Sequence, residues 1–528
     1  MRTLLLAAGL LVPWGAASAE TVTILHTNDV HSRIEPITKY DNTCNPEDDA
    51  AGECFGGSAR LATALAAERD AADGEVLLLD GGDEFQGTLF YTYYKGAAAA
   101  EIMNTLKYDA MTVGNHEFDD GPEVLAAFAD KLDFPLILGN AVFADGAVLE
   151  GKVPPTTVIE KGGIKYGLIG LAPVDTAELS SPGDKVTLID PVEAVSAAVD
   201  QLTAEGVSRI IVLSHSGYDV DQVIASEVPE VDLIVGGHSH TLLSNVVESA
   251  AGPYPTMVED SAGNETPVVQ AGAYGKYLGK LVVEFDEDGH LLSATGEPIL
   301  LDASIAPDAD LAARVAELAK PLEEVRQTVI GEAADAIDGS RETCRAAECT
   351  MGNLVADAML DRVKSQGVLI AIQNGGGLRA SIDAGDVTMG DVLTVLPFQN
   401  TLATFTLTGE AVQKALENGA SQIEEGAGRF AQVSGLRYTI DMSVAPGEGR
   451  VKNVEVDENG TWTPLDPAAE YGVVSNDFMR RGGDGYAVFA EEATDAYDSG
   501  PNLELVVSDF IAANSPYVPA LHDRITVE

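Results

Sequence analysis

At 528 residues the chain is too long for a single hydrophobic core, and two domains with a connector are expected. Its 84 acidic residues outnumber 31 basic ones and give a formal net charge of −53, which argues against binding a nucleic-acid polymer. An anionic small molecule would have to be held by local positive charge, from metal ions or a few placed arginines.

The chain begins with the pattern of a secretory signal peptide. A charged start at residues 1–2 precedes an apolar run at 4–14 that is too short to span a membrane, and small residues follow at 17–19. We expect residues 1–19 to be removed. No later apolar stretch is long enough for a transmembrane helix, and residues 521–528 lack the hydrophobic tail of a lipid-anchor signal. The expected product is a periplasmic or secreted protein without an anchor.

A first domain is expected over residues 20–305, because apolar strands alternate there with helical stretches, as in α/β folds. The predicted strands are 21–26, 76–79, 110–113, 136–138, 166–170, 210–213, 233–235, 267–270 and 278–285. The predicted helices are 58–69, 97–106, 122–131 and 191–205.

The connector is expected over residues 306–336. A helical pattern covers 309–329 with the charge mix of an exposed helix, and Pro321 predicts a kink or break inside it. A second, mixed α/β domain is expected over 337–528. Its predicted helices are 351–363 and 409–418, and its predicted strands are 368–373, 402–407, 436–440 and 471–475.

Five of the eight histidines lie in short Asp/His/Asn motifs that follow predicted strands. The candidate metal ligands are Asp29, His31, Asp83, Asn115, His215, His238 and His240. Their oxygen and nitrogen atoms suit zinc, manganese or a similar divalent ion, and no thiolate is among them. Loops at the carboxyl ends of strands usually carry the sites of open α/β sheets. The pattern predicts a two-metal phosphoesterase site.

Within this set, Asp83 follows a strand that enters a glycine turn, and we expect it to bridge the two ions. Asp80 lies closer to the strand body and is expected to be structural. Asp29 and His31 are two residues apart, so both can hold one ion only if the chain has left the alternating strand geometry.

His116 is expected to act in catalysis rather than as a ligand. It follows Asn115, and Asp119 lies three residues on, where it can orient the imidazole ring as in a dyad. A cationic imidazole would stabilise negative charge on a transferring phosphoryl group or protonate the leaving oxygen. A single buried histidine is more often simply hydrogen-bonded in a core, and His26, inside a strand, is interpreted in that way.

The second domain carries a different set of candidates. Asn374 begins a run of three glycines that ends in Arg379, where backbone amides can approach a ligand and the guanidinium can clamp an anion. Phe398 and Phe478 lie in turn-rich segments, and with Asp484 they can stack a flat base and bond sugar hydroxyls. The alternative is that both are core phenylalanines.

The four cysteines form two close pairs in sequence, and three connectivities are open. Local bonds Cys44–Cys54 and Cys344–Cys349 are expected, because both segments are loop-like and an exported protein meets an oxidising compartment. A zinc site made of four thiolates would need two paired elements with shorter spacing.

Taken together, these motifs resemble the 5′-nucleotidase family, most closely the ecto-5′-nucleotidase type. The matching segments are 24–33, 82–88, 114–119, 237–241, 374–379 and 482–486, so the resemblance covers nearly the whole mature chain. The metal motifs alone mark the calcineurin-like superfamily, and the second-domain motifs narrow it to nucleotidases. The resemblance implies a four-layer α/β/β/α metallophosphoesterase domain, a linking helix and a C-terminal mixed α/β substrate-binding domain.

The family also implies residue roles. One ion would be held by Asp29, His31, Asp83 and His240, and the other by Asp83, Asn115, His215 and His238, with His116 and Asp119 as the catalytic dyad. The base would stack between Phe398 and Phe478, with ribose contacts from Asp484. Phosphate or ribose contacts would come from Arg33, Arg345, Asn374 and Arg379. The family further supports the Cys344–Cys349 bond and implies a hinge rotation between open and closed forms.

The resulting hypothesis is an exported 5′-nucleotidase that hydrolyses nucleoside 5′-monophosphates with metal-activated water. Two divalent ions are expected, zinc first and manganese or cobalt as alternatives, in a monomer or homodimer. Rival enzymes are a nucleotide pyrophosphatase or UDP-sugar hydrolase, and a cyclic phosphodiesterase with 3′-nucleotidase activity. A rival of another class is a catalytically silent nucleotide-binding protein. Arg480-Arg481 stands where relatives tend to carry small or amide residues, which leaves base preference and phosphate number open.

Overall fold

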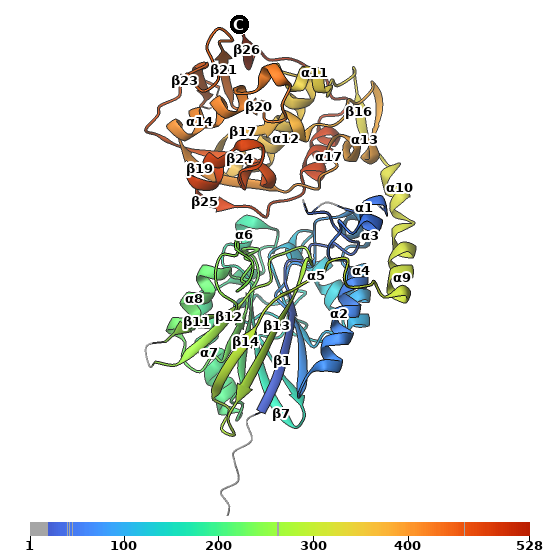
Figure 1. Cartoon of the computed structure of the whole chain (residues 1–528), viewed down its shortest axis with the longest axis vertical. Helices are drawn as coiled ribbons and strands as arrows, with labels where there is room; N and C mark the ends of the chain where they lie inside the picture. The colour runs from blue at the N-terminus through green and yellow to red at the C-terminus, as the bar shows by residue number, and fades with distance from the viewer. Residues whose placement is uncertain (1–19, 40, 42, 45, 261–262, 459) are drawn as a thin grey trace, which may run out of the picture.

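The computed structural model describes residues 20–39, 41, 43–44, 46–260, 263–458 and 460–528. The predicted signal peptide at 1–19 lies outside these residues. Within the described ranges no helix combines the length and apolar character needed to cross a membrane. The chain folds into two lobes stacked along the long axis, and a pair of helices runs along one side between them (Figure 1).

Two sheets packed face to face form the first lobe. The first has the order β14-β13-β1-β2-β3-β4, with β15 paired to β13. Its strands are β1 (Glu20–Thr27), β2 (Glu75–Asp80), β3 (Ala110–Thr112), β4 (Leu136–Ile137), β13 (Tyr277–Phe285), β14 (Leu291–Gly296) and β15 (Ile299–Leu300). The second has the order β11-β12-β10-β9-β7-β6. Its strands are β6 (Thr156–Lys161), β7 (Ile164–Leu171), β9 (Ile210–Ser214), β10 (Leu233–Val235), β11 (Thr256–Glu259) and β12 (Glu265–Val269).

Alternation of apolar side chains explains the layers, because successive residues of a strand point to opposite faces. Ile24 and Leu77 enter the core between the two sheets, whereas their neighbours Leu25 and Leu78 enter the core under the outer helices. A third core lies under the helices of the second sheet. The helices of this lobe are α1 (Pro46–Ala51), α2 (Ser58–Ala71), α3 (Leu89–Tyr94), α4 (Ala97–Leu106), α5 (Pro122–Ala129), α6 (Thr176–Leu179), α7 (Pro191–Ala204) and α8 (Tyr218–Glu227). The four-layer α/β/β/α prediction is confirmed.

The helix of the connector is interrupted at Pro321, as predicted. Helix α9 (Ala309–Ala319) ends two residues before Pro321, and α10 (Leu322–Arg326) begins directly after it. The next strand, β16 (Val329–Ala333), lies inside the stretch predicted as connector, but it pairs with β18 (Gly385–Thr388). Because its partner lies in the second lobe, we propose that the second domain begins near residue 329.

The second lobe carries a five-stranded sheet with the order β20-β17-β24-β19-β25 and a four-stranded sheet with the order β23-β22-β21-β26. Its remaining strands are β17 (Val368–Asn374), β19 (Leu402–Thr408), β20 (Ala431–Ser434), β21 (Leu436–Ile440), β22 (Val451–Asp457), β23 (Trp462–Pro464), β24 (Glu470–Asn476), β25 (Thr494–Tyr497) and β26 (Ile525–Val527). Its helices are α11 (Arg341–Cys344), α12 (Thr350–Val363), α13 (Met389–Val395), α14 (Gly409–Ala420), α15 (Asp477–Arg480), α16 (Ala487–Glu491) and α17 (Leu503–Ala513).

Two further predictions about single residues hold. Both local disulfides, Cys44–Cys54 and Cys344–Cys349, are present. His26 is fully buried, its Nε2 lies 2.8 Å from the hydroxyl of Tyr254, and burial lowers its pKa to about 3. A neutral histidine with a hydroxyl partner is a core residue, as its position inside β1 predicts.

Candidate active site

The seven predicted metal ligands meet at one edge of the two-sheet sandwich. They lie on the loops that follow five strands, β1, β2, β3, β9 and β10. Strands β1, β2 and β3 are parallel neighbours in one sheet, and β9 and β10 are parallel neighbours in the other. Parallel strands end at the same edge, so five loops far apart in sequence converge there.

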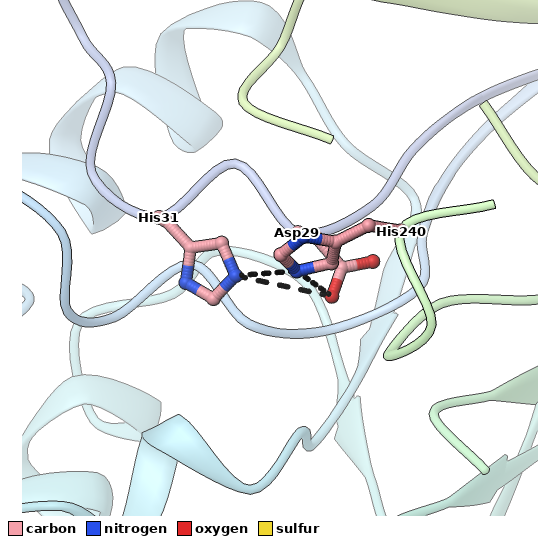
Figure 2. A group of neighbouring side chains, drawn as sticks. All are labelled: Asp29, His31 and His240. Atoms are coloured by element: carbon pink, nitrogen blue, oxygen red, sulfur yellow. Dashed lines mark hydrogen bonds and ion pairs between the residues drawn. The ribbon is translucent and has the colours of Figure 1, made fainter. Parts of the chain in front are cut away.

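The first ligand group consists of Asp29, His31 and His240 (Figure 2). The Nε2 atoms of the two histidines lie 3.0 Å apart, and Nε2 of His240 lies 3.3 Å from Oδ1 of Asp29. Nε2 of His31 lies 3.9 Å both from Oδ1 of Asp29 and from Oδ2 of Asp83. The donors point to one small volume, which Asp83 also borders.

The second ligand group consists of Asp83, His215 and His238, with Asn115 beside them. Nε2 of His215 lies 2.9 Å from Oδ2 of Asp83, and Nδ1 of His238 lies 3.0 Å from Oδ1 of Asn115. Asp83 therefore faces donors of both groups through the same carboxylate, His31 on one side and His215 on the other. This is the placement that a bridging carboxylate requires.

The donors fit two divalent cations. Asp83 Oδ2 and His215 Nε2 face each other at 2.9 Å, yet each is buried and lacks a well-formed hydrogen bond to any described residue. Buried polar atoms are normally satisfied, so an orphaned carboxylate oxygen and imidazole nitrogen call for a cation between them. Carboxylate, amide and imidazole donors suit zinc, manganese and cobalt alike.

Five of the seven ligands have left-handed backbone. The positive φ values are 51° for Asp29, 49° for His31, 61° for Asp83, 71° for His238 and 51° for His240. This conformation breaks the strict alternation of a strand, so Asp29 and His31 can face the same volume, as the chelate hypothesis requires. Such residues cost about 1–3 kcal/mol each and cluster at functional sites.

Hydrogen bonds to backbone carbonyls fix two of the histidine ligands. Nδ1 of His31 lies 3.2 Å from the carbonyl of Phe85, and Nδ1 of His215 lies 2.6 Å from the carbonyl of Gly81. In each ring Nδ1 donates that bond, so Nε2 is the atom that points into the ligand cluster. In metalloproteins generally, such hydrogen bonds with the residues behind the metal ligands fix the orientation of the ligands. Burial opposes charge on His215, but the carboxylates of Asp83 and Asp29 raise its pKa to about 10, so a bound cation would replace a proton on its Nε2.

Glu117 is a supporting residue that sequence reasoning did not identify. Its fully buried carboxylate accepts hydrogen bonds from the backbone amides of Asp83 (3.0 Å), Gly114 (2.7 Å), Glu84 (2.8 Å) and Phe85 (3.1 Å). It thereby links the turn that carries Asp83 to the loop after β3. Its only signal in the sequence is an acidic residue directly after the Gly-Asn-His motif.

Asn28 has a similar role for Asp29. Its Nδ2 donates to Oδ2 of Asp29 at 2.7 Å, and its Oδ1 accepts from the amide of Ala271 at 3.0 Å. Asp80, in contrast, accepts hydrogen bonds from Thr27 Oγ1 at 2.6 Å and from the Gly82 amide at 2.9 Å. It stabilises the strand end, as its place in β2 predicts.

His116 differs from the seven ligands because both ring nitrogens are engaged elsewhere. Nδ1 lies 2.8 Å from Oδ2 of Asp119, and Nε2 lies 2.6 Å from the carbonyl of Ser499. Both acceptors are oxygens, so the ring donates twice and is a cation. Burial opposes that charge, but the carboxylates of Asp119 and Asp83 outweigh it and raise the pKa of His116 to about 10.

At the predicted ligand His238 burial is the largest effect, and it lowers the pKa to about 3, which keeps this imidazole neutral.

Residues 497–502 of the second lobe cover the metal edge. The hydroxyl of Tyr497 accepts from Asn115 Nδ2 at 3.1 Å, and Oγ of Ser499 lies 3.3 Å from Nε2 of His240. Asn502 donates to the carbonyl of Gly87 at 2.9 Å. The segment thus contacts a ligand from each group as well as His116.

The predicted substrate residues gather in a separate cavity of about 420 Å³. Its lining residues all come from the second lobe: Arg345, Asn374, Gly376, Gly377, Arg379, Phe398, Asn400, Gly428, Phe478 and Asp484. Six of these side chains were predicted, Gly376 and Gly377 belong to the predicted glycine run, and Asn400 and Gly428 add to them. Asp484 Oδ2 accepts from Asn374 Nδ2 at 2.7 Å, and the guanidinium of Arg379 lies 5.4 Å from the ring centre of Phe398. Phe478 is 36% exposed, so it is not a core phenylalanine.

Three other arginines named above, Arg33, Arg480 and Arg481, lie outside this cavity. Arg33 stacks on Tyr274, 4.4 Å from the ring centre, and donates to the carbonyl of His31 at 3.1 Å. Arg480 makes a hydrogen bond within the second lobe, donating to the carbonyl of Phe489 at 2.8 Å. Both Arg480 and Arg481 line another cavity of about 660 Å³ between the lobes, which His238 and His240 also line.

The fold and the site together define a dimetal phosphoesterase with an added substrate lobe. Residues 22–242 match the family model of calcineurin-like phosphoesterases, and residues 329–491 match that of the 5′-nucleotidase C-terminal domain. The human 5′-nucleotidase is 38% identical over 99% of this chain and 93% of its own length. The snake venom 5′-nucleotidase of Crotalus adamanteus is 37% identical over 97% of this chain and 89% of its own. The chain therefore belongs to the 5′-nucleotidase family.

Solved structures agree with this assignment. A 5′-nucleotidase precursor from Thermus thermophilus is 42% identical, with a TM-score of 0.60 over 96% of this chain and 99% of its own. The NAD nucleotidase of Haemophilus influenzae is 26% identical, with a TM-score of 0.82 over 97% of this chain and 100% of its own.

Replacing Glu117 tests whether it organises the metal loops. In Glu117→Gln one acceptor oxygen becomes an amide that faces two backbone N–H groups, so we expect metal affinity to fall about 10- to 100-fold, as for other second-layer changes. Titration calorimetry with zinc or manganese measures this affinity. Glu123→Gln, an exposed change in α5, serves as the control. Unchanged affinity in a folded Glu117→Gln protein would contradict the role.

Proposed function

We propose that the chain is an exported, metal-dependent 5′-nucleotidase that hydrolyses nucleoside 5′-monophosphates to nucleoside and inorganic phosphate. One observation carries the proposal: a two-metal ligand set and a His–Asp dyad in one lobe are combined with an aromatic, arginine-bearing cavity in the other. Cleavage of a phosphoester requires the metal ligands and the dyad, and binding of a nucleoside requires the cavity.

In this proposal Asp29, His31, Asp83 and His240 hold one ion, and Asp83, Asn115, His215 and His238 hold the other. Zinc is our first expectation, with manganese or cobalt as alternatives. Bound ions of this kind activate water and neutralise charge on the phosphoryl oxygens.

The protein groups do the rest. Asp119 orients His116, whose Nε2–H stabilises the negative charge of the transferring phosphoryl group or protonates the leaving oxygen. Phe398 and Phe478 stack the base, while Asp484 and Asn374 bond the ribose. Arg345 and Arg379 hold the anionic side of the substrate, and Arg33 approaches it from the metal lobe.

A rotation of the lobes is part of the proposal. The nucleoside cavity is lined by second-lobe residues alone, and Nε2 of His116, which must face phosphate, is engaged by Ser499. One nucleotide must therefore meet both parts in another arrangement, reached by a hinge at the connector. The comparisons support this: the relative with 42% identity has the lower TM-score, 0.60, as two similar domains in a different mutual orientation would give.

The first experiment is phosphate release from AMP by the mature protein, before and after chelation and with zinc or manganese restored. We expect release that chelation abolishes and metal restores, with little from 3′-AMP or UDP-glucose. His116→Ala should lower kcat by about 10²- to 10⁴-fold, the usual range for a general acid, with the metal content unchanged. If nucleotide binds but no metal restores turnover, the chain is a silent binding protein.

Stacking by the two phenylalanines predicts a loss that depends on the base. Phe398→Ala and Phe478→Ala should each raise KM for AMP about tenfold, since stacking on an aromatic side chain contributes about 1–3 kcal/mol per base. Ribose 5-phosphate has the same ester but no base, so its kcat/KM should not change. Equal losses on both substrates would place these side chains outside the base site.

Spin labels can detect the rotation directly. Val246 in the first lobe and Val518 in the second are 79% and 65% exposed, and the native cysteines are all bonded in disulfides, so labels at Val246→Cys and Val518→Cys are selective. A non-hydrolysable AMP analogue added to the zinc-loaded protein should produce a second distance population. As a control, the distance between labels at Val158→Cys and Val246→Cys, both in the first lobe, should not change. A single unchanged distance at saturating analogue would contradict the rotation.

A further inference from the structure

We infer that Ser180 is a positioning residue for the catalytic dyad, holding Asp119 in the orientation in which it serves His116. This inference rests on the proposed function, because it assigns a role within the same reaction. It concerns a residue that the sequence motifs do not include.

The contact is a hydrogen bond from Ser180 Oγ to Oδ1 of Asp119, 2.8 Å long. The other oxygen, Oδ2, lies 2.8 Å from Nδ1 of His116. Each carboxylate oxygen thus has its own donor, and the two donors together fix the plane of the carboxylate. Asp119 is 22% exposed, so without the hydroxyl it could rotate and exchange its partner for water.

The backbone around Ser180 is suited to hold the hydroxyl in place. Ser180 follows α6 directly, and its amide donates to the carbonyl of Thr176 at 2.9 Å. Thr176 is fully buried, and its Oγ1 donates to the carbonyl of Pro173 at 2.6 Å. These two bonds hold Ser180 and α6 to the loop that follows β7, which ends at Leu171.

The contact also joins the two sheets of the first lobe. Asp119 lies after β3 in the first sheet, whereas Ser180 lies after β7 in the second, 61 residues away in sequence. Ser180 and the dyad line the same cavity of about 680 Å³ between the lobes. The hydroxyl therefore lies beside the proposed reaction site, and it can affect His116 through its hydrogen bond to Asp119.

Steady-state kinetics with AMP tests the inference in the metal-loaded, full-length protein. Ser180→Ala should lower kcat about tenfold, the lower end of the effect of second-layer changes, while KM and metal content stay within twofold of the parent. Ser180→Thr keeps the hydroxyl and should restore most of the rate. Ser181→Ala, a change at the exposed neighbouring serine, should behave as the parent.

A double-mutant comparison separates positioning from a general structural effect. If Ser180 acts through Asp119, adding Ser180→Ala to Asp119→Ala should lower kcat no further. An unchanged kcat in Ser180→Ala, a loss confined to KM or metal content, or an equal loss in the Asp119→Ala background would each overturn the inference. An inactive parent protein would instead be a failure of the proposed function, so the two failures are distinguishable.

Discussion

The buried carboxylates of Asp29 and Asp83 impose the constraint on which the rest of the first lobe depends. Both are fully buried, where an uncompensated negative charge would cost far more than a protein of ordinary stability can supply. Burial opposes the charge on both carboxylates, but the neighbouring histidines outweigh it and lower the pKa of Asp29 and of Asp83; a bound cation would compensate the charge in the same way. The five loops bring these donors together only in the folded protein, so cation binding there would stabilise the fold, and metal affinity is coupled to folding.

In the proposed function, the second lobe contributes the binding of the nucleoside, and the first lobe carries the groups that act on the phosphoester. Its cavity holds aromatic and guanidinium groups, while its segment 497–502 occupies the approach to His116 in this arrangement of the lobes. In the proposed function, a small phosphoester without a base would make fewer contacts in this cavity to replace those of segment 497–502. Under the proposed rotation, the nucleotide that fills the cavity would also favour the arrangement in which it reaches the metal site.

Much of this could be predicted from the sequence, because strand alternation and motif position are local signals. The family resemblance implies the four layers, and in the structure Ile24 and Leu25 face opposite cores, as strand alternation requires. Pro321 predicts the break in the connector. The four amides around Glu117 and the contact of Ser180 with Asp119 could not be predicted. Each depends on how separate loops meet in space, and neither leaves a periodicity or a spacing in the chain. The docking of segment 497–502 likewise depends on the mutual placement of two lobes.

The left-handed backbone of five ligands has a consequence for how this centre can evolve. Asp, Asn and His enter that conformation several-fold more often than other residues with a side chain. A mutation to Glu or Cys would still offer a donor atom, but it would lose this conformational tolerance as well as the fit. The turns therefore restrict which donors can be exchanged, and they favour retention of oxygen and nitrogen donors at these five positions.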